Sequence, residues 1–129
     1  MSRELDAKVA EKVMGLEVYR SRQDWMQKGM PHIAEWAETV FYPAYWHPEY
    51  ELATVVSNYS TDIKASFEVV EKLGEDGWIV TLHRDLKWFC DLVWFTADDT
   101  TWLPTTEADT LPEAICKAAL KAVGEDATE

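Results

Sequence analysis

Apolar residues recur every three or four positions in three segments of the chain, and this spacing predicts three amphipathic helices. In the first, Leu5, Val9 and Val13 form the stripe. In the last, Ile115, Ala119 and Val123 do so. The predicted helices cover Ser2–Met14, Tyr59–Gly74 and Thr110–Gly124.

The ends of these helices carry residues that typically start or stop one. Ser60 or Thr61 is suited to cap the second helix, and Gly74 is suited to end it. Thr110 and Glu113 have the spacing of a capping box at the start of the third. The sequence therefore predicts where each helix begins and ends, as well as its buried side.

Alternation of side chains predicts two longer strands between the second and third helices. In "GWIVTLHRD", Trp78, Val80 and Leu82 share one face, and the residues between them share the other. In "KWFCDLVWF" (87–95) both faces are largely apolar, so this strand is expected to be central and covered on both sides. The segment "HRDLK" (83–87) is the predicted hairpin connection.

The first half of the chain is less regular. Leu16–Arg20 and Thr54–Val56 have the composition of short strands, and the periodicity of Pro31–Phe41 favours a further helix. Because proline cannot donate to a strand ladder, Pro43 and Pro48 are expected to exclude a central strand between them.

This order of elements predicts an α/β chain of the α+β type, folded as a single-domain α-β-α sandwich. In this arrangement a small sheet is covered by helices on both faces. The domain is expected to span residues 1–124, with an aromatic, acidic insert at about 29–58 and a frayed tail at 125–129.

The net charge of the chain limits the classes of partner that it is expected to bind. There are 24 Asp and Glu residues against 12 Lys and Arg residues, a net charge of −12. Nucleic acid needs basic residues on its phosphates, so direct nucleic-acid binding is not expected. No Lys or Arg stands between Lys28 and Lys64, where the insert lies.

The expected location is a cytosol. No apolar run approaches the ~20 residues that a membrane span needs, and the N-terminal segment is charged throughout. In a reducing compartment Cys90 and Cys116 are expected to be two separate buried thiols.

Three blocks of sequence resemble one known family. They are "VAEKVMG" (9–15), "YSTDIKASFEVVEKL" (59–73) with "GW" at 77–78, and "EADTLPEAICKAALKAVG" (107–124). In this order they are similar to the phage ABA-sandwich domain family. The resemblance implies an α-β-α sandwich and a phage or prophage source, and it brings no catalytic residues to this chain.

No motif in the sequence fixes a reaction, so a non-enzymatic protein without a cofactor is expected. "HRDLK" matches the start of a kinase catalytic loop, but Cys90 stands where that loop needs Asn. The histidines and cysteines show no metal-ligand spacing, so no metal site is predicted.

The segment "FYPAYWHPEY" (41–50) is the predicted binding site. Exposed rings anchor protein interfaces, although the same rings can also pack locally, and both interpretations stay open. The candidate residues are Phe41, Tyr42, Tyr45, Trp46, Tyr50 and Glu49.

Three functions compete. The first is a phage accessory protein that binds a host protein, for example a defence protein. The second is sequestration of a nucleotide immune signal, and the third is a role in virion assembly. For the second, the candidate anion-binding residues are Arg20, Arg22, Arg84 and Lys87. Self-association into a homo-oligomer is left open.

Overall fold

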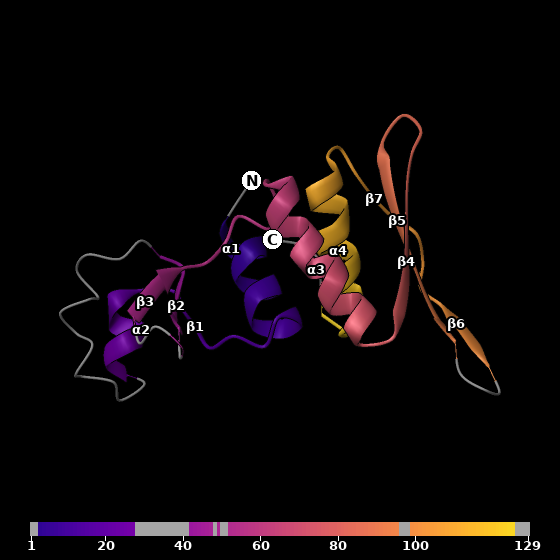
Figure 1. Cartoon of the computed structure of the whole chain (residues 1–129). Helices are drawn as coiled ribbons and strands as arrows, with labels where there is room; N and C mark the ends of the chain where they lie inside the picture. Colours follow the sequence, from indigo (N-terminus) through magenta and orange to yellow (C-terminus); the bar gives the residue numbers. More distant parts are fainter. Residues whose placement is uncertain (1–2, 28–41, 48, 50–51, 96–98, 126–129) are drawn as a thin grey trace.

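The computed structural model describes residues 3–27, 42–47, 49, 52–95 and 99–125. Helices stand at both ends of this part of the chain, with seven strands and two further helices between them (Figure 1). The helical elements are α1 (Arg3–Lys8), the π-helical turn η1 (Val9–Val13), α2 (Arg22–Gln27), α3 (Ile63–Glu75) and α4 (Leu111–Ala122). The strands are β1 (Val18–Tyr19), β2 (Ala44–His47), β3 (Leu52–Val55), β4 (Trp78–Arg84), β5 (Trp88–Phe95), β6 (Thr100–Trp102) and β7 (Thr106–Ala108).

The strands form two antiparallel sheets, and helices α1, α3 and α4 lie between them (Figure 1). Sheet A has the order β1-β2-β3, and sheet B has the order β4-β5-β6 with β7 also paired to β5. The α+β class predicted from the sequence is confirmed. The core fills the space between the helices and sheet B, where Val69, Leu92 and Ile115 are buried.

The first predicted helix is present, but its second half is wound more widely. The Met14 N–H donates to the Val9 carbonyl, five residues back, at 3.0 Å. This spacing defines a π-helical turn. Gly15 then ends the helix with a φ of 74°, which glycine adopts without strain.

Helix α3 is present where predicted, but its ends differ from the prediction. Its N-cap is Asp62, whose carboxylate accepts the Lys64 N–H at 3.0 Å, so the expectation of Ser60 or Thr61 was wrong. Ser60 instead donates its N–H to buried Asp6 at 2.7 Å. The helix also runs past Gly74, because the left-handed residue that ends it is Gly77, with a φ of 103°.

Helix α4 is confirmed, with two corrections. Thr110 is the N-cap residue, but its side chain makes no capping hydrogen bond, and Glu113 pairs with Lys117 at 2.8 Å instead. Val123 was expected in the buried stripe, yet it is exposed. The reason is that Val123 is already the C-cap, beyond the last turn that faces the core.

Sheet A contradicts the expectation about its prolines. Strand β2 is the central strand, paired with β1 on one side and β3 on the other. Pro43 lies immediately before this four-residue strand, so its missing N–H removes no ladder bond. Its carbonyl still accepts the Val56 N–H at 2.9 Å.

In sheet B, the predicted hairpin is confirmed, and β4 pairs with β5 along seven residues from Trp78 to Arg84. Strand β5 is central, as predicted, because β6 and β7 pair with its other edge. The expectation that both of its faces are covered holds only in part: on the face away from the helices Val93 is buried and Phe89 and Asp91 are half-buried, but no described helix lies on that side (Figure 1). Alternate residues such as Cys90 and Leu92 are buried against the helices, whereas Thr81 and His83, on the other face of the sheet, are exposed.

Three remaining expectations concern particular residues. Both Cys90 and Cys116 are free and buried, as predicted. The predicted helix Pro31–Phe41 lies outside the described residues. In the described part of the chain, no helix has both the length and the apolar composition needed to cross a membrane.

Candidate functional site

The described aromatic residues of the predicted binding segment lie in and beside strand β2. Tyr42, Tyr45 and Trp46 are each half-buried, and Glu49 is exposed. Phe41 and Tyr50 lie outside the described residues. The three described rings are therefore neither fully buried nor fully exposed.

Tyr45 is the member of this group most closely tied to the core. Its ring packs against the buried cluster, and burial raises the pKa of its hydroxyl, with a further contribution from the charge of Glu68 on α3. The ring centroid lies 6.0 Å from that of His47, two residues along the strand. Tyr45 therefore joins sheet A to the helices, and Trp46 is left as the better candidate anchor.

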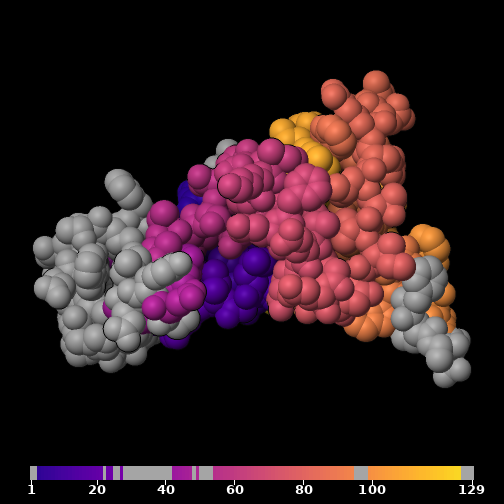
Figure 2. All heavy atoms as spheres, in the orientation of Figure 1, coloured from indigo at the N-terminus to yellow at the C-terminus, as the bar shows by residue number. Residues whose placement is uncertain are grey.

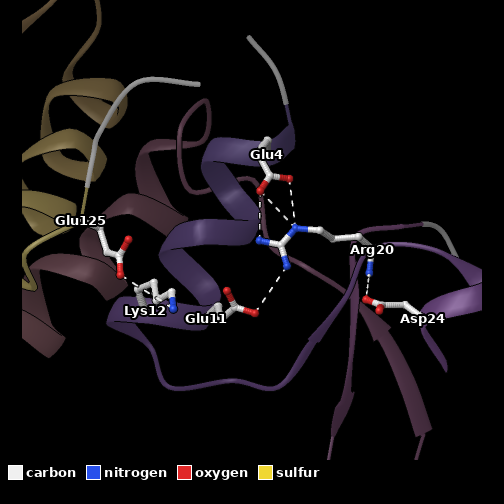
Figure 3. Close-up of polar contacts among 6 residues, drawn as sticks. All are labelled: Glu4, Glu11, Lys12, Arg20, Asp24 and Glu125. Carbon is white, nitrogen blue, oxygen red and sulfur yellow. Dashed lines mark hydrogen bonds and ion pairs between the residues drawn. The ribbon is translucent and has the colours of Figure 1, made fainter. Parts of the chain in front are cut away.

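Arg20, the first candidate anion-binding residue, is held by carboxylates (Figure 3). Its Nε lies 3.1 Å from both carboxylate oxygens of Glu4, and its Nη1 lies 3.4 Å from Glu11. The bond to Glu4 is the largest cause of a raised pKa for Arg20. This guanidinium fastens β1 to α1 and η1, and its positive charge is already balanced.

The other candidate cations lie elsewhere. Arg84 and Lys87 stand in the β4–β5 hairpin of sheet B, whereas Arg20 follows β1 of sheet A. The Arg84 guanidinium lies 5.4 Å from the Trp88 ring centroid, and Lys87 Nζ lies 4.0 Å from Asp109. For Arg22, which lies in α2, the structure describes the backbone and not the side chain. The structure does not bring Arg20 together with Arg84 and Lys87.

An apolar surface lies on the face of sheet B that points away from the helices, called here the open face. Ile79, Val93 and Trp102 are consecutive partners across β4, β5 and β6, so they form one row on this face. Ile79 is 50% exposed and Trp102 is 68% exposed, while Val93 between them is 5% exposed. The row is thus a small apolar platform bordered by a large exposed indole.

Aromatic and polar side chains continue the open face along the strands. The rings of His83 and Phe89 stack at 4.9 Å with an angle of 9° between their planes. Asp91 lies 3.5 Å from His83 Nδ1 and accepts a hydrogen bond from the Thr105 hydroxyl at 2.6 Å. Glu107 is exposed opposite Phe89 on β7. Two carboxylates therefore lie on this face to one side of the apolar row, with Asp91 two residues from Val93 and Glu107 further along, opposite Phe89.

The His83–Asp91 pair is the one arrangement on this face that resembles part of a catalytic site among the described residues. A His–Asp pair can orient a general base, but a catalytic triad also needs a nucleophile hydrogen-bonded to the histidine. Here the Thr105 hydroxyl donates to Asp91 instead. The described residues contain no group of three or more His, Cys, Asp or Glu that could hold a metal ion.

Sequence reasoning missed the open face for two reasons. The alternation in β4 placed Ile79 and His83 on the same face, but that face was expected to be covered. Trp102 was not assigned to any strand, because β6 has only three residues and is too short for an alternating pattern. The signal was a lone tryptophan between "DDTT" and a proline.

Comparison with solved structures supports the fold. A phage protein from Bacillus cereus ATCC 14579, whose crystal structure was determined at 2.0 Å, superposes with a TM-score of 0.65 at 21% identity. The match covers 98% of this chain and 91% of that protein. No curated protein matches the chain.

Comparison with protein families gives the second result. The model of the phage ABA sandwich domain matches residues 7–120, which include every described element from η1 to most of α4. The same family was identified from the blocks near both ends of the domain. The chain belongs to the phage ABA sandwich domain family.

Proposed function

We propose that this chain is a phage accessory protein that acts by binding a host protein, without catalysis, through the open face of sheet B. The exposed side chains of Ile79 and Trp102, which flank buried Val93 in one row, are the observation that carries the proposal. Tryptophan is among the residues that most often anchor protein interfaces. A flat sheet face with an exposed indole offers such an anchor without rearrangement of the backbone.

The charge of the chain defines the partner. Asp91 lies on the same face two residues from Val93, Glu107 lies further along this face opposite Phe89, and the whole chain carries a net charge of −12. A basic partner surface with an apolar centre would complement both features. The carboxylates would accelerate encounter, while the indole would slow dissociation.

The aromatic segment around β2 is the second candidate contact within the same function. Trp46 is half-buried and lies in a part of the chain without Lys or Arg. Its lower exposure makes it the weaker anchor. Sequestration of a nucleotide is less well supported, because Arg20 is balanced by Glu4 and Glu11 and lies apart from Arg84. A virion-assembly partner would use the same exposed row.

The experiment compares three single variants in binding to the partner. The partner is first isolated by cross-linking the tagged chain in infected host cells and identifying the linked peptides. Trp102→Ala is expected to weaken binding by roughly thirtyfold, the loss of about 2 kcal/mol typical of an interface anchor. Trp46→Ala measures the contribution of β2. Leu86→Ala, at the exposed hairpin tip, is the matched control.

Several outcomes separate the alternatives. Binding that weakens as salt is added supports the role of the carboxylates, because salt screens such attraction. Normal binding by Trp102→Ala with loss in Trp46→Ala would move the site to β2. A partner that is a virion protein would indicate assembly, and saturable binding of a nucleotide by the purified chain would contradict the proposal.

A further inference from the structure

Strand β4 is an edge strand. It pairs with β5 along one side, and no described residue pairs with the other side. At seven residues, it is longer than β6, the strand at the opposite end of the sheet. Figure 2 shows helix α3 and the β4–β5 hairpin next to each other on one face of the molecule. The edge therefore presents a row of backbone donors and acceptors beside α3.

This edge lacks the features that normally prevent pairing. From Gly77 to Leu82 there is no charged residue and no proline, and the only charged or titratable side chains of β4 are His83 and Arg84 at its end. Natural edge strands are usually protected by lysine, proline or bulges. In a chain in which 28% of the residues are charged, six uncharged residues at an open edge point to a pairing partner.

We propose that β4 pairs in antiparallel orientation with β4 of a second copy of this chain, about a two-fold axis through Thr81. Thr81 is the middle residue of the strand, so this register pairs all seven residues. It places Trp78 opposite Arg84 of the second copy and Ile79 opposite His83 of the second copy. No like charges then face each other directly.

The geometry favours a second copy over a foreign strand. A two-fold contact uses the same edge of both chains and closes at two subunits. Both α3 helices come to the same side of the joined sheet, and α3 carries two further exposed apolar residues, Ile63 and Phe67, one turn apart. The open faces of the two copies join into one surface. A foreign strand in this edge is the competing occupant that the experiment distinguishes.

The test uses two threonines that are both exposed on strands of sheet B. Thr81→Cys places two thiols opposite each other at the axis, so mild oxidation is expected to give a disulfide-linked dimer. Thr101→Cys, on β6, is expected to remain uncross-linked under the same conditions. The natural cysteines are both buried. In sedimentation equilibrium, the natural chain is expected to be a dimer. The Thr81→Lys substitution is expected to raise the dissociation constant of this dimer roughly fivefold or more.

Three results would overturn this proposal. The first is that the natural chain sediments as a monomer at every concentration. The second is that Thr81→Lys and Thr101→Lys weaken the dimer equally. The third is that the chain associates beyond two subunits without limit. A monomer that pairs with an added peptide along β4 would assign the edge to a foreign strand. The outcome is independent of the proposed function, because Trp102→Ala tests partner binding and is expected to leave the dissociation constant of the dimer unchanged.

Discussion

The two faces of sheet B are built by the same strands and both carry apolar side chains, yet these side chains differ in how far they are buried. On the helix-facing side, Cys90 and Leu92 are each 1% exposed. On the open face, Ile79 and Trp102 keep half or more of their surface in water. Alternation along a strand therefore specifies two faces, and the position of the helices decides which one is the core.

This difference separates stability from function. An apolar side chain stabilises the fold in proportion to the surface that it removes from water. The helix-facing residues do so almost completely, whereas Trp102 contributes little for its size. Substitution by alanine can thus distinguish the two groups. Apolar residues that stabilise the fold lower the free energy of unfolding when truncated, whereas those available to a partner change it little.

The largest effect is expected from a matched pair of truncations across this sheet. Leu92→Ala leaves a cavity against the helices and is expected to lower the free energy of unfolding by about 2–5 kcal/mol. Ile79→Ala is expected to lower it by less than about 1 kcal/mol, because the side chain is half in water. Urea unfolding followed by circular dichroism measures both. Equal losses would mean that the open face is covered and belongs to the core.

Two glycines at the end of α3 provide the next comparison. Gly77 has a φ of 103°, and a Cβ there would lie 3.0 Å from the Trp94 ring, on the packed side of the sheet. Gly77→Ala is expected to destabilise the fold by about 1–3 kcal/mol. Gly74 lies within the helix with open space around it, so Gly74→Ala is expected to stabilise by about 0.5–1 kcal/mol. Thermal unfolding of both variants reveals the opposite signs.

The helices and the long hairpin were predictable because they depend on local signals. Periodicity located α1, α3 and α4, and alternation located β4 and β5. Exact caps were harder to predict, because several neighbouring residues could serve. Asp62 caps α3, while Ser60 is committed to Asp6, fifty-four residues away. Nothing near Ser60 in the sequence indicates that long-range bond.

The short strands and the open face depend on long-range contacts. Strands β6 and β7 have three residues each and form only because β5 offers its edge. Prolines near β2 suggested a break, yet the strand fits between them. The exposure of Trp102 follows from which side the helices pack on, and the alternating pattern is equally consistent with either side. The predicted site at Phe41, Tyr42, Tyr45, Trp46, Glu49 and Tyr50 stays a prediction.

The buried thiol on the helix-facing side predicts a dependence on alkaline pH. Burial, with a smaller effect of Asp91, raises the pKa of Cys90 from 9.0 to about 12. In the unfolded chain this thiol ionises first, so its stabilising contribution is complete below about pH 9 and is lost as the pH rises towards 12. The loss is about 1.4 kcal/mol per pH unit for one group. Cys90→Ala is expected to show a shallower decline in urea unfolding between pH 9 and 10, and an unchanged slope would contradict this.

The smallest effect is expected from the polar contacts of the open face. Asp91→Asn removes the carboxylate charge that lies 3.5 Å from His83 Nδ1, on a side chain that is half exposed, while an amide oxygen can still accept from Thr105. Exposed pairs of this kind contribute less than about 1 kcal/mol, and salt screens them. Urea unfolding at low and high salt measures the change. A loss as large as that of Leu92→Ala would show that His83, Phe89 and Asp91 are part of the folding core, and the open face would then lose its separate role as a surface for a partner.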